Sequence, residues 1–176
     1  VVCCAAGGST AEAGVPREVL GSHATVGRIV RDYDIDAASY PARLEARRAE
    51  FDAWKVKADA ELAALRIPPG CPQGLEDPRT SVYSPALLFN AMLSPFVPGT
   101  FRGVLWYQGE SNAARWGEAA EVLHAMVSAW RVRLGRRDLR FFTVQLANFG
   151  TRDAAKTDTP WARFRETQER FAKETA

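Results

Sequence analysis

Apolar and polar positions come in blocks along this chain, and one block stands out by its sharp boundary. Residues 104–107 form an unbroken apolar run of β-branched, aliphatic and aromatic side chains, which is typical of a buried parallel strand covered on both faces. Polar residues follow at once, and among them Ser111 and Asn112 are favourable N-cap residues for a helix. The pattern predicts a strand, a tight turn and a helix. The polar turn then lies at the carboxyl end of the strand, where ligands bind in open α/β sheets.

Three stretches have the apolar spacing of an amphipathic helix. Residues 39–66 are the longest, with Pro41 placed in the first turn. Their repeat is short, which favours packing on the rest of the domain over a two-stranded coiled coil. Residues 116–134 form the second helix, which Gly135 is expected to end. The third begins at residue 159, and its apolar face is expected to consist of Trp161, Phe164, Gln168 and Phe171.

Two further apolar runs, residues 1–6 and 139–146, are predicted to be strands. Since strands alternate with helices along the chain, we predict an α/β fold with a parallel sheet in three layers. Gly7 and Gly8 follow the first of these strands, and glycines there let backbone N–H groups approach a ligand. An ordinary glycine turn explains them equally well. A nucleotide-binding domain is disfavoured because the full fingerprint Gly-x-Gly-x-x-Gly is absent.

Composition narrows the class of protein further. The chain has 176 residues, of which 47% are hydrophobic and 25% charged, as expected for one soluble globular domain. The net charge of +2 does not indicate a nucleic-acid partner, and the densest basic run, residues 136–140, falls at a predicted helix end, where cations complement the helix dipole. No run approaches the roughly 20 apolar residues that span a bilayer, so no membrane segment is predicted. The three cysteines have no metal-ligand spacing and are expected as buried thiols.

Four segments together resemble the sialate O-acetylesterase family, a branch of the SGNH hydrolases. Residues 106–113 (WYQGESNA) are similar to its third signature block, and residues 84–95 to the segment just upstream. Residues 144–149 and 161–168 resemble two segments downstream, in the family's order. Residues 7–14 are similar to a family segment Gly-Gly-Thr-x-x-Glu-Ala-Trp, with Gly14 in place of the tryptophan. The resemblance implies a flavodoxin-like SGNH domain, incomplete at both ends, with a helical and loop insertion at about 39–80.

The resemblance also implies a division of roles among the polar residues. Gln108 stands where other SGNH hydrolases place a side-chain amide that donates to the oxyanion, and Gly8 or Gly7 would add a backbone N–H. Glu110 is expected to be a buried acid that braces the turn, although a charge at a helix N-terminus explains it equally well. Five residues are expected to line or support a substrate pocket, unless they serve only in packing: Trp106, Tyr107, Asn90, Gln145 and Arg165.

A serine esterase also needs a nucleophile and a histidine base, and the family blocks that supply them have no counterpart here. The chain is expected to begin after the first block and to stop before the last. His124 is predicted to face solvent, and His23 has no aspartate at triad-like spacing. Ser111 lacks the Gly-x-Ser-x-Gly context of a nucleophile elbow, and helix capping explains it.

The sequence thus predicts the oxyanion and positioning half of an esterase site, with an acetylated sugar as substrate and no metal or organic cofactor. Sialic acid, xylan and other acetylated sugars are equally compatible with it. The alternative is a non-catalytic carbohydrate-binding or scaffold remnant of the same fold. A sheet that lacks its neighbouring elements would expose apolar edges, so aggregation is expected.

Overall fold

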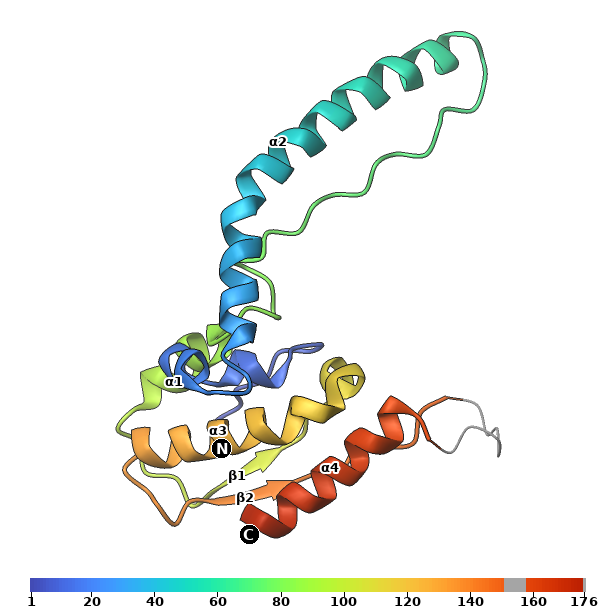
Figure 1. The fold of residues 1–176 in the computed structure, drawn as a ribbon. Coiled ribbons are helices and arrows are strands. Elements are labelled where there is room, and N and C mark those ends of the chain that lie inside the picture. The colour runs from blue at the N-terminus through green and yellow to red at the C-terminus, as the bar shows by residue number, and fades with distance from the viewer. Residues whose placement is uncertain (151–157, 176) are drawn as a thin grey trace. The chain divides into compact units, whose positions relative to one another are not determined.

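A computed structural model of the protein describes residues 1–150 and 158–175. The chain divides into two compact units, one made of Val1–Asp32 together with Val82–Ala176 and the other of Tyr33–Ser81. The insertion predicted at about 39–80 falls within the second unit. Figure 1 shows the course of the chain through both units.

The first unit contains a parallel pair of strands, β1 (Gly103–Trp106) and β2 (Arg140–Thr143), in register from Gly103 opposite Arg140 to Trp106 opposite Thr143. They lie side by side in Figure 1 and are joined through helix α3 (Trp116–Arg133). Parallel pairing of the two predicted strands is confirmed. The sheet has two strands in the part of the chain that the structure describes, and three layers remain a prediction.

Helices α3 and α4 (Pro160–Thr175) share one hydrophobic core with the strands. Trp130 of α3 meets Trp106 edge to face, with ring centroids 6.0 Å apart, and also packs against Phe141 at 5.8 Å. Both helices were predicted, and the predicted face of α4 is confirmed at Phe164, Gln168 and Phe171, which are buried. Gly135 has a φ of +63° just after α3, so its predicted role at the helix end is also confirmed.

The opposite face of the sheet is open in this structure. Leu105 is 83% exposed and Phe142 is 55% exposed, whereas their neighbours Trp106 and Phe141 point into the core. The expectation that residues 104–107 are covered on both faces is therefore wrong for the residues described. An unbroken apolar run does not reveal which side chains find a partner, because successive side chains of a strand point to opposite faces.

The N-terminal segment differs from its prediction as well. Residues 1–6 form no strand, because none of the residues that the structure describes pairs with their backbone along its length. The thiols are not buried either: Cys3 and Cys71 are exposed, and Cys4 is half-buried with its Sγ donating to the carbonyl oxygen of Met92 at 3.2 Å.

Short helical segments complete the first unit and lead into the site. They are η1 (Ala11–Gly14), α1 (Arg17–Ser22), η2 (Phe89–Leu93), η3 (Ser94–Phe96) and η4 (Glu110–Arg115). Of these, η1 and η4 carry the polar groups of the candidate site.

The second unit is built on helix α2 (Arg28–Ala63), which begins in the first unit. The helix starts well before residue 39, so Pro41 lies inside it and the prediction that Pro41 occupies the first turn is wrong. The remaining residues of the unit return beside α2 as irregular chain (Figure 1). Trp54 Nε1 donates to the carbonyl oxygen of Pro69 at 2.9 Å, and the guanidinium of Arg79 lies 5.6 Å from the ring centre of Tyr40.

Candidate functional site

The candidate site begins where β1 ends, at the turn formed by Gln108 and Gly109. Gly109 is required here by packing, because a Cβ atom at this position would collide with the ring of Phe164. Gln108 is 9% exposed, and its Nε2 donates to the carbonyl oxygen of Ser9 at 3.1 Å and to Oδ1 of Asn112 at 2.6 Å. Its Oε1 is buried and has no partner among the residues described. The turn after β1 is thus joined directly to the segment that follows Gly8.

Asn112 is the centre of this junction and is 1% exposed. Its Oδ1 accepts from Gln108 and from the backbone N–H of Ala11 at 2.9 Å. Its Nδ2 donates to Oε2 of Glu12 at 2.8 Å. One carboxamide therefore holds the η1 segment and the turn after β1 in a fixed relation, although they are about a hundred residues apart in the sequence.

Glu12 is a buried carboxylate whose charge is compensated. It is 2% exposed and forms an ion pair with Nη2 of Arg115, while Nη1 of Arg115 pairs with Glu118 at 2.6 Å. Burial by itself lowers the pKa of the Arg115 guanidinium, but the two glutamates outweigh burial and leave this pKa raised. Arg115 therefore keeps its charge, and the buried carboxylate keeps a partner.

The predicted capping role of Ser111 and Asn112 is wrong. Neither side chain caps a helix, and Gly109 precedes the 3₁₀ segment η4. Ser111 Oγ donates instead to the carbonyl oxygen of Gly8 at 2.6 Å, and Asn112 makes the bonds described above. Both side chains serve contacts with a distant segment, which local helix preferences do not encode.

Glu110 is exposed, so the expectation of a buried acid at this position is wrong. Glu110 lies in the first turn of η4, which agrees with the alternative explanation of a negative charge at a helix N-terminus. Gly7 and Gly8 are both exposed, and Gly8 has a φ of +76°. That backbone conformation favours glycine, so a glycine turn is present at the point where Ser111 binds.

The residues predicted to line a pocket lie in several different places. Trp106 points into the core against Trp130, with its Nε1 buried and unpartnered within the residues described, whereas Tyr107 is 59% exposed. Asn90 is an exposed residue of η2. The structure does not bring these three side chains together.

Gln145 and Arg165 do meet, at the end of β2. Gln145 Nε2 donates to the carbonyl oxygen of Arg165 at 3.0 Å, and Nη2 of Arg165 donates back to Gln145 Oε1 at 3.1 Å. Nη1 of Arg165 also binds Asn148. These contacts tie β2 to α4 beside the candidate site.

Gln168 connects that region to the Gln108 turn and is 1% exposed. Its Oε1 accepts from the backbone N–H of Leu146 at 3.0 Å, and its Nε2 donates to the carbonyl oxygen of Gln108 at 3.1 Å. A single buried amide thus fixes the carboxyl ends of both strands.

Sequence reasoning assigned no site role to Asn112, Glu12, Arg115 or Gln168. Gln168 carried a signal, since it is a polar residue on a predicted apolar face between Phe164 and Phe171. Glu12 carried one too, because it fills the glutamate position of the Gly-Gly-Thr-x-x-Glu segment. Arg115 and Asn112 form part of the site only through contacts with η1, which the sequence alone does not reveal.

Both histidines are paired with glutamates. His124 Nε2 lies 2.8 Å from Glu174, and its ring packs edge to face on Phe171; His23 Nε2 lies 3.6 Å from Glu121. Within the described ranges, no group of three or more His, Cys, Asp and Glu residues is placed to hold a metal ion. In the same ranges, no helix combines the length and apolar character needed to cross a membrane.

The arrangement is that of an α/β protein whose parallel strands end in a buried polar junction. A family model of carbohydrate esterases, the sialic acid-specific acetylesterases, matches residues 79–175, which is more than half of the chain. The chain therefore belongs to this family of carbohydrate esterases. The match covers both strands and Gln108, while Gly7, Gly8 and Glu12 lie outside it. Searches of curated proteins and of solved structures found no match.

Proposed function

We propose that this chain supplies the oxyanion and positioning half of an esterase site that removes O-acetyl groups from sialic acid or related sugars through a serine acyl-enzyme. Membership of a carbohydrate esterase family supports the reaction class. The observation that carries the proposal is the junction of Gln108 and Asn112 with residues 9–12, which places a glycine turn beside a side-chain amide at the carboxyl end of a strand.

In this proposal Gln108 and the turn of Gly7 and Gly8 stabilise the negative charge that develops on the acetyl carbonyl oxygen. Both N–H groups of the Gln108 amide already donate hydrogen bonds, to Ser9 and to Asn112. To donate to the oxyanion, Gln108 must therefore give up the longer of the two bonds, which joins it to the carbonyl oxygen of Ser9 at 3.1 Å. The shorter bond to Asn112 then keeps the amide oriented. A fixed carboxamide suits this role because it donates a hydrogen bond without transferring a proton.

The remaining predicted residues have supporting roles in the proposal. Glu110 contributes a negative charge at the turn, while Gln145 and Arg165 hold the end of β2. Trp106 supports the turn from the core, and Tyr107 and Asn90 provide exposed polar surface for a substrate.

Nucleophile and base are proposed to come from residues other than the serine and histidines described above. Ser111 directs its hydroxyl hydrogen to the carbonyl oxygen of Gly8 and not to an imidazole, while the histidines contact Glu121 and Glu174 and not Ser111. We therefore expect this chain alone to be inactive. The first check is treatment of the folded chain with a fluorophosphonate and with p-nitrophenyl acetate, with mass spectrometry to locate any adduct. Labelling of Ser111 together with turnover would overturn the assignment.

A positive test uses a chimera. Residues 79–175 replace the matching segment of an active esterase of the family, and hydrolysis of acetylated sugars is measured. We expect activity in the chimera, and Gln108→Ala should lower kcat by roughly 10²–10³ with little change in KM, since an oxyanion donor acts in the transition state. Arg170→Ala, at an exposed position of α4 with no role in the proposed site, is the control, with kcat changed less than about twofold.

The second candidate function is a non-catalytic carbohydrate-binding remnant. The hydrogen bond of Ser111 Oγ to the backbone carbonyl oxygen of Gly8, which joins this serine to a peptide group and not to an imidazole base, favours it. A folded, inactive chimera combined with binding of acetylated sugars by this chain would select this function over the esterase.

A further inference from the structure

An open hollow of about 360 Å³ lies in the first unit beside the glycine turn. Ser111, whose Oγ binds the carbonyl oxygen of Gly8, forms part of its lining, and so does Thr10. The volume falls within the roughly 300–1,000 Å³ of small-molecule sites. None of the residues predicted from the sequence to line a substrate pocket contributes to it.

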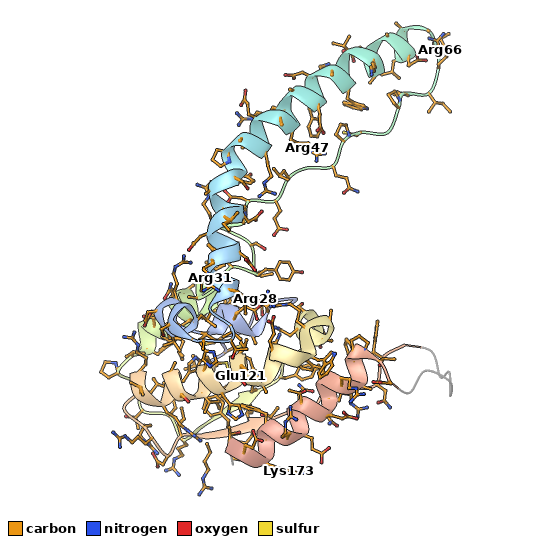
Figure 2. All side chains as sticks on the ribbon, viewed as in Figure 1. Arg28, Arg31, Arg47, Arg66, Glu121 and Lys173 are labelled. Carbon is orange, nitrogen blue, oxygen red and sulfur yellow. The ribbon has the colours of Figure 1, made fainter. Side chains whose placement is uncertain are left out.

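The charges around this hollow are arranged as an alternating chain. Glu12 pairs with Arg115, Arg115 with Glu118, Glu118 with Arg28, and Arg28 with Asp32 at 3.5 Å. Arg28 belongs to the first turn of α2, and Figure 2 labels its side chain. The lining itself holds two carboxylates and two guanidinium groups, and Glu118, which pairs with both arginines without lining the hollow, gives the cluster one excess negative charge. Sites that bind carboxylates use arginine with an uncompensated charge, whereas here carboxylates offset the charge of both guanidinium groups, which keep further N–H groups as donors to a neutral acceptor.

The other lining groups suit a sugar ring. Tyr83 is 52% exposed and gives the hollow an aromatic ring. Thr10 is 6% exposed, and its Oγ1 is buried without a partner among the residues described. A buried hydroxyl without a hydrogen bond costs free energy, which a ligand hydroxyl can recover. Aromatic surface with a few convergent polar groups is the usual lining of a small-molecule site.

We infer that this hollow is the sugar subsite of the proposed esterase and that it takes an uncharged acetylated sugar rather than one that carries a carboxylate. Sugar hydroxyls can both accept from Arg28 and Arg115 and donate to Asp32. A ligand carboxylate can only accept, and it meets the excess negative charge next to the buried Glu12. The inference rests on the proposed function and narrows its substrate class.

The test measures the binding of two sugars to the 176-residue chain. Binding is monitored by the shifts of backbone amide signals in nuclear magnetic resonance titrations. The two probes are methyl 2-O-acetyl-β-xylopyranoside, which is neutral, and 9-O-acetyl-N-acetylneuraminic acid, which carries a carboxylate. We expect the neutral sugar to shift the amides of Thr10, Tyr83 and Ser111, with a Kd at least tenfold lower than that of the acidic sugar. Equal or tighter binding of the acidic sugar, or absence of binding of the neutral one, overturns the inference.

Asp32→Asn sharpens the test because it removes the excess charge at an exposed side chain. We expect it to tighten binding of the acidic sugar severalfold and to leave the neutral sugar unchanged. Glu121→Gln changes the net charge equally but does not line the hollow, so both affinities should stay the same. If Glu121→Gln has the effect of Asp32→Asn, the hollow is not the site. Binding needs no hydrolysis, so an inactive chimera would reject the esterase proposal without altering this result.

Discussion

Asn112 is the residue on which the polar junction depends, because its carboxamide both accepts and donates. Asn112→Asp keeps the shape but replaces the donor to Glu12 by a second carboxylate. We expect the free energy of unfolding to fall by about 3 kcal/mol at pH 7, as for a buried charge left without compensation. The loss should shrink as the pH falls, because the neighbouring carboxylate raises the pKa of the new carboxyl group and protonation removes the repulsion.

Urea unfolding followed by tryptophan fluorescence measures this change. Asn148→Asp is the matched control, since Asn148 is exposed and its Oδ1 accepts from Arg165, which a carboxylate can still do. It should alter stability by less than about 0.5 kcal/mol. Equal effects of the two variants, or an Asn112→Asp loss that does not depend on pH, would contradict a charge effect at the junction.

Cys4 differs from the other thiols in its surroundings. Partial burial raises the pKa of the Cys4 thiol, and the charge of the neighbouring Cys3 raises it further. The Cys4 thiol also donates a hydrogen bond to the carbonyl oxygen of Met92. A raised pKa means less thiolate at a given pH, so iodoacetamide at pH 8 should alkylate Cys4 severalfold more slowly than the exposed Cys71. Peptide mass spectrometry measures both rates. In urea the difference should vanish, and equal rates in the folded protein would contradict the burial of Cys4.

At the scale of elements, Gln168 joins α4 to the ends of both strands. Gln168→Met preserves size but leaves the N–H of Leu146 and the carbonyl oxygen of Gln108 without this partner. We expect a loss of about 2–3 kcal/mol, because buried polar groups left unpaired carry their full desolvation cost. Hydrogen exchange of the Leu146 amide should quicken more than that of amides inside α3. Gln73→Met, at an exposed position of the second unit, is the control and should change neither quantity.

The elements that sequence patterns predicted well are those whose apolar residues recur with a helical period. The helices α3 and α4 are confirmed because Leu123, Trp130, Phe164 and Phe171 each need cover, and their spacing places them on one side. Parallel pairing of β1 and β2 followed from the alternation of strands and helices. By contrast, residues 1–6 have the composition of a strand but lack a backbone partner, and a partner cannot be read from composition.

Within the site, the sequence identified Gln108 and the glycine turn as a candidate, and the structure joins them through hydrogen bonds. The sequence did not identify the residues that hold this candidate site in place, because Asn112 and Ser111 have side chains that serve equally well as helix caps. The choice between capping and long-range bonding depends on η1 lying beside η4, which is a tertiary contact. Local propensity contains no information about that contact.

At the scale of the whole molecule, the sheet of the first unit has one packed face and one exposed face. Phe141 is 7% exposed and Phe142 is 55% exposed, so adjacent phenylalanines test the two faces separately. Phe141→Ala should lower the free energy of unfolding by about 3–5 kcal/mol, as is usual for a buried phenylalanine.

Phe142→Ala should instead change the free energy of unfolding little and reduce self-association, so that the chain stays monomeric up to a higher concentration. The reason is that Phe142, Leu105 and Val144 form exposed apolar surface on neighbouring strands. Analytical ultracentrifugation over a range of concentrations measures self-association, and urea unfolding measures stability. Leu105→Lys, on the neighbouring strand, should reproduce the effect of Phe142→Ala, since both remove apolar area from the same face. If neither variant reduces association while Phe141→Ala still unfolds the chain readily, the open face is not the surface that drives aggregation.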